Sequence, residues 1–365
     1  MLKYFSYEPS DTPGTYEVCY GTEITELKNY AKPFVEKHSS FVYIIDQKLP
    51  ESILKTVVEI TDVPAEAVVR IDSAQKNIER VISIWDHMVK NVPSAAIAIG
   101  GGTVGDISGL ACGTYQRGIP RIYFPTTVLS MVDASIGGKS GIDHTGVKNS
   151  IGVLHYPEAV INFVPFLDTL DDGEYYSGFA EVIKAAVLYD EAFFTKLDKV
   201  ATGKRLGYED LTEVLYESSV IKAQICEEPN NKKIRLLYGH AVGHAYEKLT
   251  DGKKRHGDCV AIGMHTEGAL AVLAGHWKED EWKRQAELIR RFNLPIDMPM
   301  DTDLDELIAK MAKYKKLVEP ESLLFVLPDR IGHVVDQDKD CRVRLSKAEI
   351  KGLLQKAQEF THGGQ

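Results

Sequence analysis

The sequence predicts an α/β fold for the first part of the chain and a helical fold for the second part. Short apolar runs alternate with a helical pattern up to about residue 155, whereas almost every segment after Pro157 has the apolar spacing of a helix. A length of 365 residues also favours two domains over one. We therefore expect an α/β domain over residues 1–155 and an all-α domain over residues 156–365.

The expected α/β domain contains short strands rich in β-branched and aromatic residues, and one clear helix. Strand, helix and strand in succession imply a parallel sheet with crossover helices. The strands are expected at 16–21, at 41–46, at 94–102 (where the strand runs into a glycine turn) and at 120–127, and the helix at 79–92.

The expected helical domain consists of five long segments with helical periodicity. A proline-rich break at 293–303 interrupts the pattern near the end of the chain. The segments are 174–200, 209–228, 239–249, 258–277 and 279–292.

The composition restricts the partners of this protein. A formal net charge of −10 argues against general binding to nucleic acid or to an anionic membrane, although a local basic pocket for a small anion remains open. No apolar run approaches the ~20 residues of a transmembrane helix, and the first ten residues lack the pattern of a signal peptide. The five cysteines are scattered, as expected for reduced thiols, so we expect a cytoplasmic protein.

A glycine-rich turn follows the apolar run 95–100. Gly100, Gly102 and Gly105 have GxGxxG spacing, and backbone N–H groups at the start of a helix can hold a pyrophosphate. The alternative is a turn selected for steric reasons alone. The acidic residue that usually follows about 20 positions later is absent. Asp46, at the end of an earlier strand, is a candidate for binding the ribose, and an ordinary turn or N-cap residue is an equal alternative.

Three further groups of residues are candidates for binding or catalysis. Asp133, Lys139, Lys148 and Asn149 lie among glycines and small residues in 125–152, which favours an anion site over a polar surface loop. Glu181 and Lys184 are three apart on one helical face. The residues on both sides of them are apolar, which favours a buried pair with a function over an ordinary surface ion pair. His240 and His244 are four apart, and spacing alone selects them as metal ligands without ranking Glu181 against His256.

These segments, in this order, resemble the dehydroquinate synthase family of sugar-phosphate cyclases. The resemblance runs from about residue 96 to residue 275. The matching stretches are GGGTVGD, YQRG, PTTVLSMVDASIGGKSGID, KNSIG, SGFAEVIK, GHAVGHA and HGDCVAIGM.

The resemblance implies a Rossmann-like domain that binds NAD+ and a helical domain that binds Zn2+, or Co2+ in its place. It assigns the metal to Glu181, His240 and His256, and makes His244 a substrate contact instead of a ligand. The implied reaction is the redox-neutral cyclisation of a ketose phosphate, in which a hydroxyl is transiently oxidised, phosphate is eliminated, and reduction and aldol closure give a carbocycle. The active site is expected between the two domains.

The resemblance also implies roles for individual residues. Phosphate and substrate oxygens would be held by Lys139, Asn149, Lys233 or Arg235, and Lys316. Arg117 would reach the phosphate site of a partner subunit in a homodimer. The substrate would be lined by Asp133, Lys184, Lys222 and His244. The NAD+ site would comprise Asp46, Asp72, Gly101, Gly102, Thr103, Val104, Gly105, Asp106, Thr126, Thr127, Lys139, Lys148, Phe166 and Thr169.

The chain departs from the family pattern at two places. In the cofactor segment 72–77, Ala74 and Asn77 replace a Glu and a Lys, and Lys76 is expected to compensate. Before His240, Leu237 replaces an Asn, Lys233 replaces an Arg, and the preceding loop is short. We therefore expect a substrate other than the usual heptulosonate phosphate, with an ordinary dehydroquinate synthase only slightly less favoured, although the GGKS motif favours the dehydroquinate and aminodehydroquinate branches. The alternatives are a cyclase for an aminated or other sugar phosphate, and a metal-dependent polyol dehydrogenase.

Overall fold

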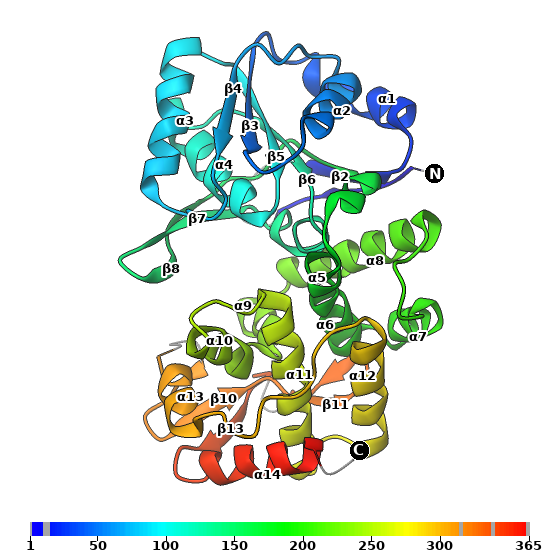
Figure 1. Cartoon of the computed structure of the whole chain (residues 1–365), viewed down its shortest axis with the longest axis vertical. Coiled ribbons are helices and arrows are strands. Elements are labelled where there is room, and N and C mark those ends of the chain that lie inside the picture. Colours follow the sequence, from blue (N-terminus) through cyan, green and yellow to red (C-terminus); the bar gives the residue numbers. More distant parts are fainter. Residues whose placement is uncertain (1, 10–14, 314–316, 337–339, 363–365) are drawn as a thin grey trace. The chain divides into compact units, whose positions relative to one another are not determined.

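The computed structural model describes residues 2–9, 15–313, 317–336 and 340–362 (Figure 1). The chain divides into two compact units. The first unit consists of Met1–Asp171 and Gly207–Ala223, and the second of Asp172–Leu206 and Gln224–Gln365. This division differs from the predicted boundary at residue 155, because a strand at Ala159–Phe163 completes the sheet of the first unit.

A seven-stranded sheet forms the centre of the first unit, in the order β1-β2-β9-β6-β5-β3-β4. Its strands are β1 (Lys3–Tyr7), β2 (Tyr16–Gly21), β3 (Phe41–Asp46), β4 (Val68–Ile71), β5 (Ala95–Gly100), β6 (Arg121–Pro125) and β9 (Ala159–Phe163). All neighbours are parallel except β1 and β2. The order in which successive strands are added to the sheet reverses between β3 and β5, because β4 lies on one side of this point and β6 and β9 lie on the other. Ligands of open α/β sheets bind at the carboxyl ends of the strands at such a reversal point.

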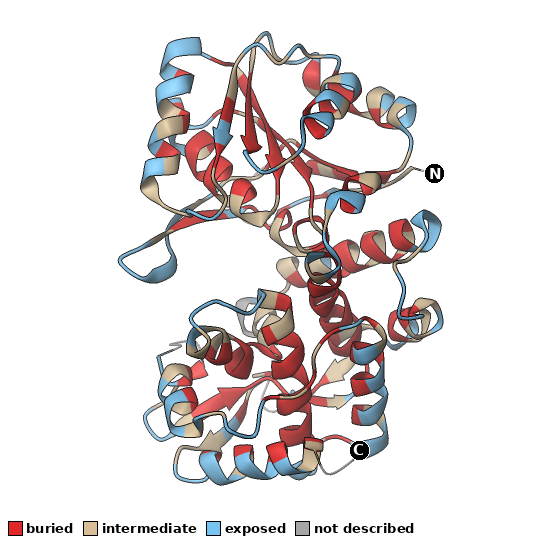
Figure 2. Ribbon diagram, viewed as in Figure 1, coloured by how far each residue is buried: buried red, intermediate tan, exposed pale blue. Residues whose placement is uncertain are grey.

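Helices cover both faces of this sheet. The helices α1 (Ile24–Val35) and α2 (Glu51–Thr61) pack on the face that carries Ile97 and Ile99. The helices α3 (Ile78–Asn91) and α4 (Gly102–Thr114) pack on the face that carries Val42 and Ala96. Because successive residues of a strand point to opposite faces, strands covered on both sides are mostly apolar, and Figure 2 shows them buried.

A hairpin, three short helices and part of a long helix complete the first unit. The hairpin strands are β7 (Lys139–His144) and β8 (Val147–Leu154), and most of β8 is exposed (Figure 2). The short helices are η1 (Tyr115–Arg117), η2 (Ser130–Ala134) and η3 (Val164–Thr169). The long helix α8 (Tyr208–Glu227) begins in the first unit, where Ser219 bonds to Tyr20, and its last residues belong to the second unit.

The second unit is mostly helical, as predicted. Its helices are α5 (Asp172–Ser177), α6 (Phe179–Tyr189), α7 (Glu191–Val200), α9 (Asn230–Lys233), η4 (Ile234–Leu237), α10 (His240–Leu249), α11 (His256–Leu273), α12 (Glu279–Arg291), α13 (Leu304–Met311) and α14 (Ile350–His362). Helix α11 has no polar face and is buried along nearly its whole length, as expected of a central helix, although His265 and Glu267 are buried within it.

The prediction of an all-α second domain is wrong in one respect. Two antiparallel strand pairs occur, β10 (Ser322–Phe325) with β13 (Val343–Ser346), and β11 (Pro328–Arg330) with β12 (His333–Val334). Strands of two to four residues are too short to produce a recognisable alternation of apolar and polar residues. Among the described residues of both units, no helix is long and apolar enough to cross a membrane.

Candidate functional site

The hydroxyl of a tyrosine contacts the backbone of the glycine turn in the first unit. Gly100 ends β5, Gly101 caps α4, and α4 begins at Gly102. The Tyr123 hydroxyl on β6 lies 3.1 Å from the carbonyl oxygen of Gly100 and donates to that of Gly101 at 2.9 Å. A Cβ atom on Gly105 would lie 2.8 Å from this hydroxyl, so only glycine fits there. The first-turn amides of Gly102, Thr103 and Val104 have no partner within the helix and suit an anion.

Asp46 and Asp72 end neighbouring strands beside this turn. Asp46 is the last residue of β3, and Asp72 follows β4 directly. Each carboxylate accepts one backbone N–H bond, from Lys48 at 3.0 Å and from Ala74 at 3.1 Å. A carboxylate has about four acceptor positions, so each of these side chains can stabilise its own turn and still accept from a ribose hydroxyl. Asp46 lies next to the reversal point between β3 and β5, where the topology favours a nucleotide.

Lys76 connects the cofactor segment to the hairpin. Its ammonium is 2.5 Å from Asp106 Oδ2 and also contacts Asn149. Its carbonyl oxygen accepts from the Asp143 N–H at 2.9 Å, and Asp143 in turn accepts from the Asn149 N–H at 2.8 Å. Burial raises the pKa of Asp106 above its ordinary value, and Lys76 opposes that rise. Asn77, the other departure in this segment, caps α3 by accepting from the Arg80 N–H.

Several predicted residues of the first unit meet at one hollow of about 410 Å³. It is lined by Asp106, Lys139, Ser140, Gly141, Asn149, Gly152, Val153 and Leu154. Lys148 is exposed on β8, and Arg117 is exposed in η1 with a φ of 70°. Asp133 of η2 forms an ion pair of 2.5 Å with Lys222 of α8.

The remaining predicted cofactor residues follow β6 and β9. Thr126 is buried and its N–H bonds to Gly100, and the Thr127 hydroxyl bonds to Ser130 at 2.8 Å. Thr169 bonds to the carbonyl oxygen of Phe166 at 2.8 Å. Phe166 lies within the apolar core under the sheet and is 3% exposed, so a contact of its ring with a cofactor stays a prediction.

Four side chains from three helices of the second unit converge on one point. Nitrogen atoms of His240, His244 and His256 lie within 4.8 Å of one another. Glu181 Oε1 lies 3.6 Å from Nε2 of both His240 and His256. Ligand atoms of one zinc ion are about 3–4 Å apart, because each bond to zinc is about 2 Å long. Among the described residues, the three histidines form the one group of His, Cys, Asp and Glu side chains compact enough to share a metal.

The surroundings of these groups prepare them to bind a metal. His240 Nδ1 donates to the Tyr238 carbonyl oxygen at 3.0 Å, which leaves a lone pair on Nε2. His256 Nδ1 lies 3.6 Å from Glu247 Oε2, so its Nε2 also faces Glu181. Glu181 Oε1 is buried and accepts no hydrogen bond from any described residue. An orphaned carboxylate oxygen between two imidazole nitrogens fits a divalent cation.

The electrostatics of the cluster depend on Lys184. Its ammonium pairs with Glu181, and it donates to the Leu236 carbonyl oxygen at 2.9 Å. Burial raises the pKa of Glu181, but Lys184 and the two imidazoles outweigh burial and hold that pKa well below its ordinary value. Burial, followed by Lys184, lowers the pKa of His240. Burial also lowers the pKa of His256, but the two flanking carboxylates raise it to about 9.

Sequence reasoning missed two carboxylates in this region. Glu267 on α11 is fully buried and accepts from the N–H groups of Gly239 at 2.8 Å and Val242 at 3.0 Å, which fixes the start of α10. Burial raises the pKa of Glu267 to about 8. Glu247 lies seven residues after His240, on the same face of α10, and this helical spacing is the signal that identifies it.

The segment that departs from the family pattern forms α9 and η4. The Arg235 guanidinium pairs with Glu228 and lies 4.9 Å from the centre of the Tyr189 ring. Its charge is therefore already balanced within the second unit. Lys233 and Leu237 are half-buried, and Lys316 lies outside the described residues.

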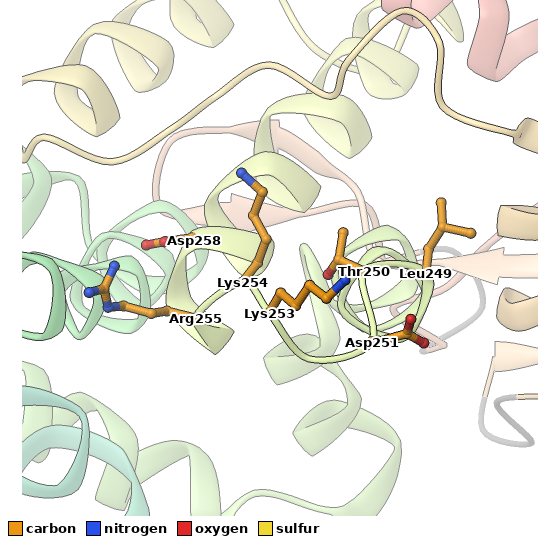
Figure 3. A pocket seen from close by; sticks show the side chains of 7 residues that line it. All are labelled: Leu249, Thr250, Asp251, Lys253, Lys254, Arg255 and Asp258. Atoms are coloured by element: carbon orange, nitrogen blue, oxygen red, sulfur yellow. The ribbon is translucent and has the colours of Figure 1, made fainter.

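The loop before His256 is basic but offers no focused anion site. Its side chains line a hollow of about 490 Å³, formed by Leu249, Thr250, Asp251, Lys253, Lys254, Arg255 and Asp258 (Figure 3). Lys253 points toward Thr250, whereas Lys254 and Arg255 point in different directions. Arg255 donates to Glu174 at 3.0 Å. The three cations therefore do not converge on one ligand.

Comparisons with known proteins agree with this geometry. Residues 66–177 match the family model of the 3-dehydroquinate synthase N-terminal domain, and residues 178–317 match that of the C-terminal domain. The 3-dehydroquinate synthase of Synechococcus sp. (strain CC9605) is 40% identical over 270 residues, which cover 72% of this chain and 71% of the relative. The chain belongs to the 3-dehydroquinate synthase family.

Solved structures support the fold of this 3-dehydroquinate synthase family member. A 2-deoxy-scyllo-inosose synthase, solved with carbaglucose-6-phosphate, NAD+ and Co2+, has a TM-score of 0.85 at 22% identity and covers 97% of this chain and 100% of its own. The 2-epi-5-epi-valiolone synthase of Streptomyces hygroscopicus subsp. jinggangensis, solved with NAD+ and Zn2+, has a TM-score of 0.80 at 24% identity over 96% and 98%. At these identities the likeness concerns the fold.

Proposed function

We propose that the protein is an NAD- and zinc-dependent sugar-phosphate cyclase of the dehydroquinate synthase type. The overall reaction converts a ketose phosphate to a carbocycle with release of phosphate and no net change of redox state. The observation that carries the proposal is the convergence of Glu181, His240, His244 and His256, in a chain of this family that also has a glycine turn at the reversal point of its sheet.

The first unit would bind the dinucleotide, which supplies a hydride acceptor that later returns the hydride. The amides of Gly102, Thr103 and Val104 suit its pyrophosphate, because they open α4 beside a turn that Tyr123 holds in place. Asp46 and Asp72 would accept from ribose hydroxyls. Solved relatives of the same fold contain NAD+, which supports this assignment.

The second unit would bind zinc, or cobalt, through Glu181, His240 and His256. A bound cation of this kind polarises a hydroxyl and lowers its pKa. We prefer Glu181 to His244 as the third ligand, because its Oε1 is buried, lacks a donor, and is equally far from Nε2 of His240 and of His256. His244 would then contact the substrate.

The chain's own charged groups would bind and orient the substrate. Lys139 and Asn149 share one hollow of the first unit and would hold phosphate oxygens. The resemblance also assigns Lys233, a residue of the second unit, to phosphate. Asp133 and Lys222, already paired, present an acceptor and a donor to substrate hydroxyls. Lys184, next to Glu181, would hold a substrate oxygen near the metal.

We further propose that the heptulosonate phosphate of the usual family reaction is a poor substrate. Leu237 cannot form the hydrogen bonds of the expected Asn, and Lys233 replaces a forked guanidinium with a point charge. Arg235 does not restore the fork, because Glu228 and Tyr189 already engage it. An aminated or otherwise different sugar phosphate is the preferred alternative. A kcat/KM for the heptulosonate of ~10⁴ M⁻¹s⁻¹ or more would contradict this proposal.

We also propose a homodimer, with Arg117 reaching the partner's phosphate site. Six large apolar side chains of the first unit are exposed on α3, at its C-terminal end and on the hairpin, namely Ile82, Val89, Val92, Val147, Ile151 and Leu154. We infer that these side chains form one patch, because a contiguous exposed apolar patch marks a protein–protein interface. Sedimentation should give a dimer that Val89→Glu with Leu154→Glu weakens.

We also propose that the protein is cytoplasmic. All five cysteines are described and none forms a disulfide, which supports the cytoplasm as the compartment.

One experiment tests the cyclase proposal against the polyol dehydrogenase alternative. The zinc-loaded protein is incubated with NAD+ and a panel of sugar phosphates and polyols, while phosphate and NADH are followed together. A cyclase releases phosphate in large excess over bound NAD+ without accumulating NADH. Stoichiometric NADH from a polyol, without phosphate, would overturn the proposal.

A further inference from the structure

One buried cation of the first unit has no part in the function proposed so far. Arg121 is the first residue of β6 and is only 4% exposed. Its NH1 group donates to the Gly105 carbonyl oxygen at 2.6 Å and to the Ser108 hydroxyl at 2.9 Å. Its Nε atom has no hydrogen-bond partner among the described residues.

The guanidinium also lacks a counter-ion. No carboxylate of a described residue lies within 4 Å of it, and Asp106, the nearby acid, is engaged by Lys76. The ring of Tyr123 lies 5.3 Å from the guanidinium carbon and provides only a weak electrostatic partner. Burying an ionised group without a partner costs free energy. We therefore expect a negative charge to compensate the buried guanidinium.

The position of Arg121 indicates where that charge would come from. Gly105 lies in the first turn of α4, so the guanidinium bonds to the same turn whose amides face outward. Tyr123, two residues along β6, holds the carbonyl oxygens of Gly100 and Gly101. Arg121 and Tyr123 therefore lie on the same face of β6, against α4. Tyr123 contacts the glycine turn, whereas the Arg121 guanidinium lies beside residues 105–109 of α4, so an anion at the N-terminal end of α4 would face this buried cation along the first turns of the helix.

We propose that Arg121 is a positioning residue that adds a buried positive charge to the N-terminal end of α4 and thereby strengthens the binding of a dinucleotide pyrophosphate. The inference rests on the proposed binding of NAD+. The guanidinium acts through Gly105 and the helix end and does not touch the phosphates. A unit charge about 10 Å from a doubly charged anion, at an effective dielectric constant near 20, changes the affinity by at least about tenfold.

The test compares a ligand that contains the pyrophosphate with one that does not. Binding of ADP-ribose and of adenosine is measured for the zinc-loaded wild type, Arg121→Gln, Arg121→Lys and Arg70→Met. Gln keeps a donor for Gly105 but loses the charge, and Lys keeps the charge. Arg70 is the matched control, because it lies on β4 of the same sheet but is exposed and paired with Glu51. Melting temperatures and zinc contents are recorded for every variant.

We expect Arg121→Gln to bind ADP-ribose about tenfold more weakly or worse, and adenosine within twofold of the wild type. Arg121→Lys should recover most of the loss, and Arg70→Met should bind as the wild type does. Equal weakening of both ligands would mean a structural role and overturn the inference, as would unchanged binding of ADP-ribose. If Gln does not fold, Lys decides: wild-type affinity for ADP-ribose supports the charge, and a large loss overturns it. Failure of the wild type to bind ADP-ribose would overturn the NAD+ proposal as well.

Discussion

Single residues around the proposed metal have separable effects, because they approach it from different helices. Replacing His256 with Ala removes a proposed ligand whose Nε2 lies 3.6 Å from Glu181 Oε1, so we expect the variant to lose both zinc and activity. Replacing His244 with Ala should leave zinc in place and remove activity. Metal analysis of the two purified proteins checks this pair. Zinc lost from His244→Ala and kept by His256→Ala would favour the ligand set that helical spacing selects.

Glu247 offers a second prediction at this scale. Its carboxylate lies 3.6 Å from His256 Nδ1, and we expect it to orient the ring so that Nε2 faces Glu181 and the proposed metal. Glu247→Gln should weaken zinc binding by about 10–100-fold, the usual effect of losing such an orienting carboxylate. Competition with a chelator measures the affinity. Glu279→Gln, on the exposed start of α12, serves as the control. Unchanged affinity in Glu247→Gln would show that the contact does not orient His256.

His265 gives a prediction about stability and pH. Burial lowers the pKa of this imidazole from 6.5 to about 3, and its ring stacks on Trp282 at 4.7 Å without a hydrogen-bond partner among the described residues. Between pH 6.5 and about 3 the unfolded chain therefore binds a proton that the folded chain does not. Stability is lost as the pH falls through this window, by up to about 1.4 kcal/mol per pH unit.

The variant His265→Phe keeps the stacked ring and removes the titration. We expect its free energy of unfolding to fall less than that of the wild type between pH 7 and pH 4. Urea denaturation at several pH values measures the difference. His87→Gln, at an exposed position on α3, should follow the wild type. Parallel curves for His265→Phe and the wild type would mean that His265 is not the titrating group.

At the scale of elements, the sequence predicts the buried strands well. The strands expected at 16–21 and 41–46 coincide with β2 and β3, and the helix expected at 79–92 is α3 within one residue. These segments are apolar or regularly periodic, so local pattern and packing agree. The hairpin β7–β8 is different, because most of β8 is exposed and no alternation marks it. The predicted helix 174–200 is divided at Gly178 and Asp190, which cap α6 and α7.

The metal cluster shows why the site is harder to predict than the elements. Helical spacing finds neighbours on one helix, and therefore selects His240 with His244. Glu181 and His256 come from α6 and α11, and only tertiary packing brings them to His240. The resemblance supplies that information, and spacing does not contain it.

The start of α10 gives a prediction for a whole element. Gly239 has a φ of 76°, and a Cβ atom there would lie 2.6 Å from Met264 and 2.9 Å from the Val260 carbonyl oxygen. Gly239→Ala should therefore destabilise the second unit by several kcal/mol and displace His240. Gly252 has a φ of 69° with nothing within 4 Å, so Gly252→Ala should cost only about 1 kcal/mol. Denaturation of both variants measures the difference, and equal losses would mean that the close approach to α11 is unimportant.

At the scale of the whole molecule, we predict that each ligand protects its own unit. Zinc would bind groups that all belong to the second unit, and NAD+ would bind mainly residues of the first. A ligand at 100 times its dissociation constant stabilises what it binds by about 2.7 kcal/mol. Removing zinc with a chelator should speed hydrogen exchange in α6, α10 and α11. Removing NAD+ should speed it in β5 and α4. Uniform changes throughout the chain would show instead that the two units unfold together.

The segment 207–223 has a consequence for how the protein is made. It packs with the first unit through Tyr20 and Asp133, yet it is encoded after the first thirty-odd residues of the second unit. On the ribosome, the strands of the sheet are complete before this helix is made, because residues 172–206 are synthesised in between. That synthesis takes a few seconds at about 5–20 residues per second. During this interval the surface that α8 will cover is open to chaperones. A gene cut at residue 155 or 171 would leave that surface permanently bare, so simple truncation is a poor route to the isolated nucleotide-binding half.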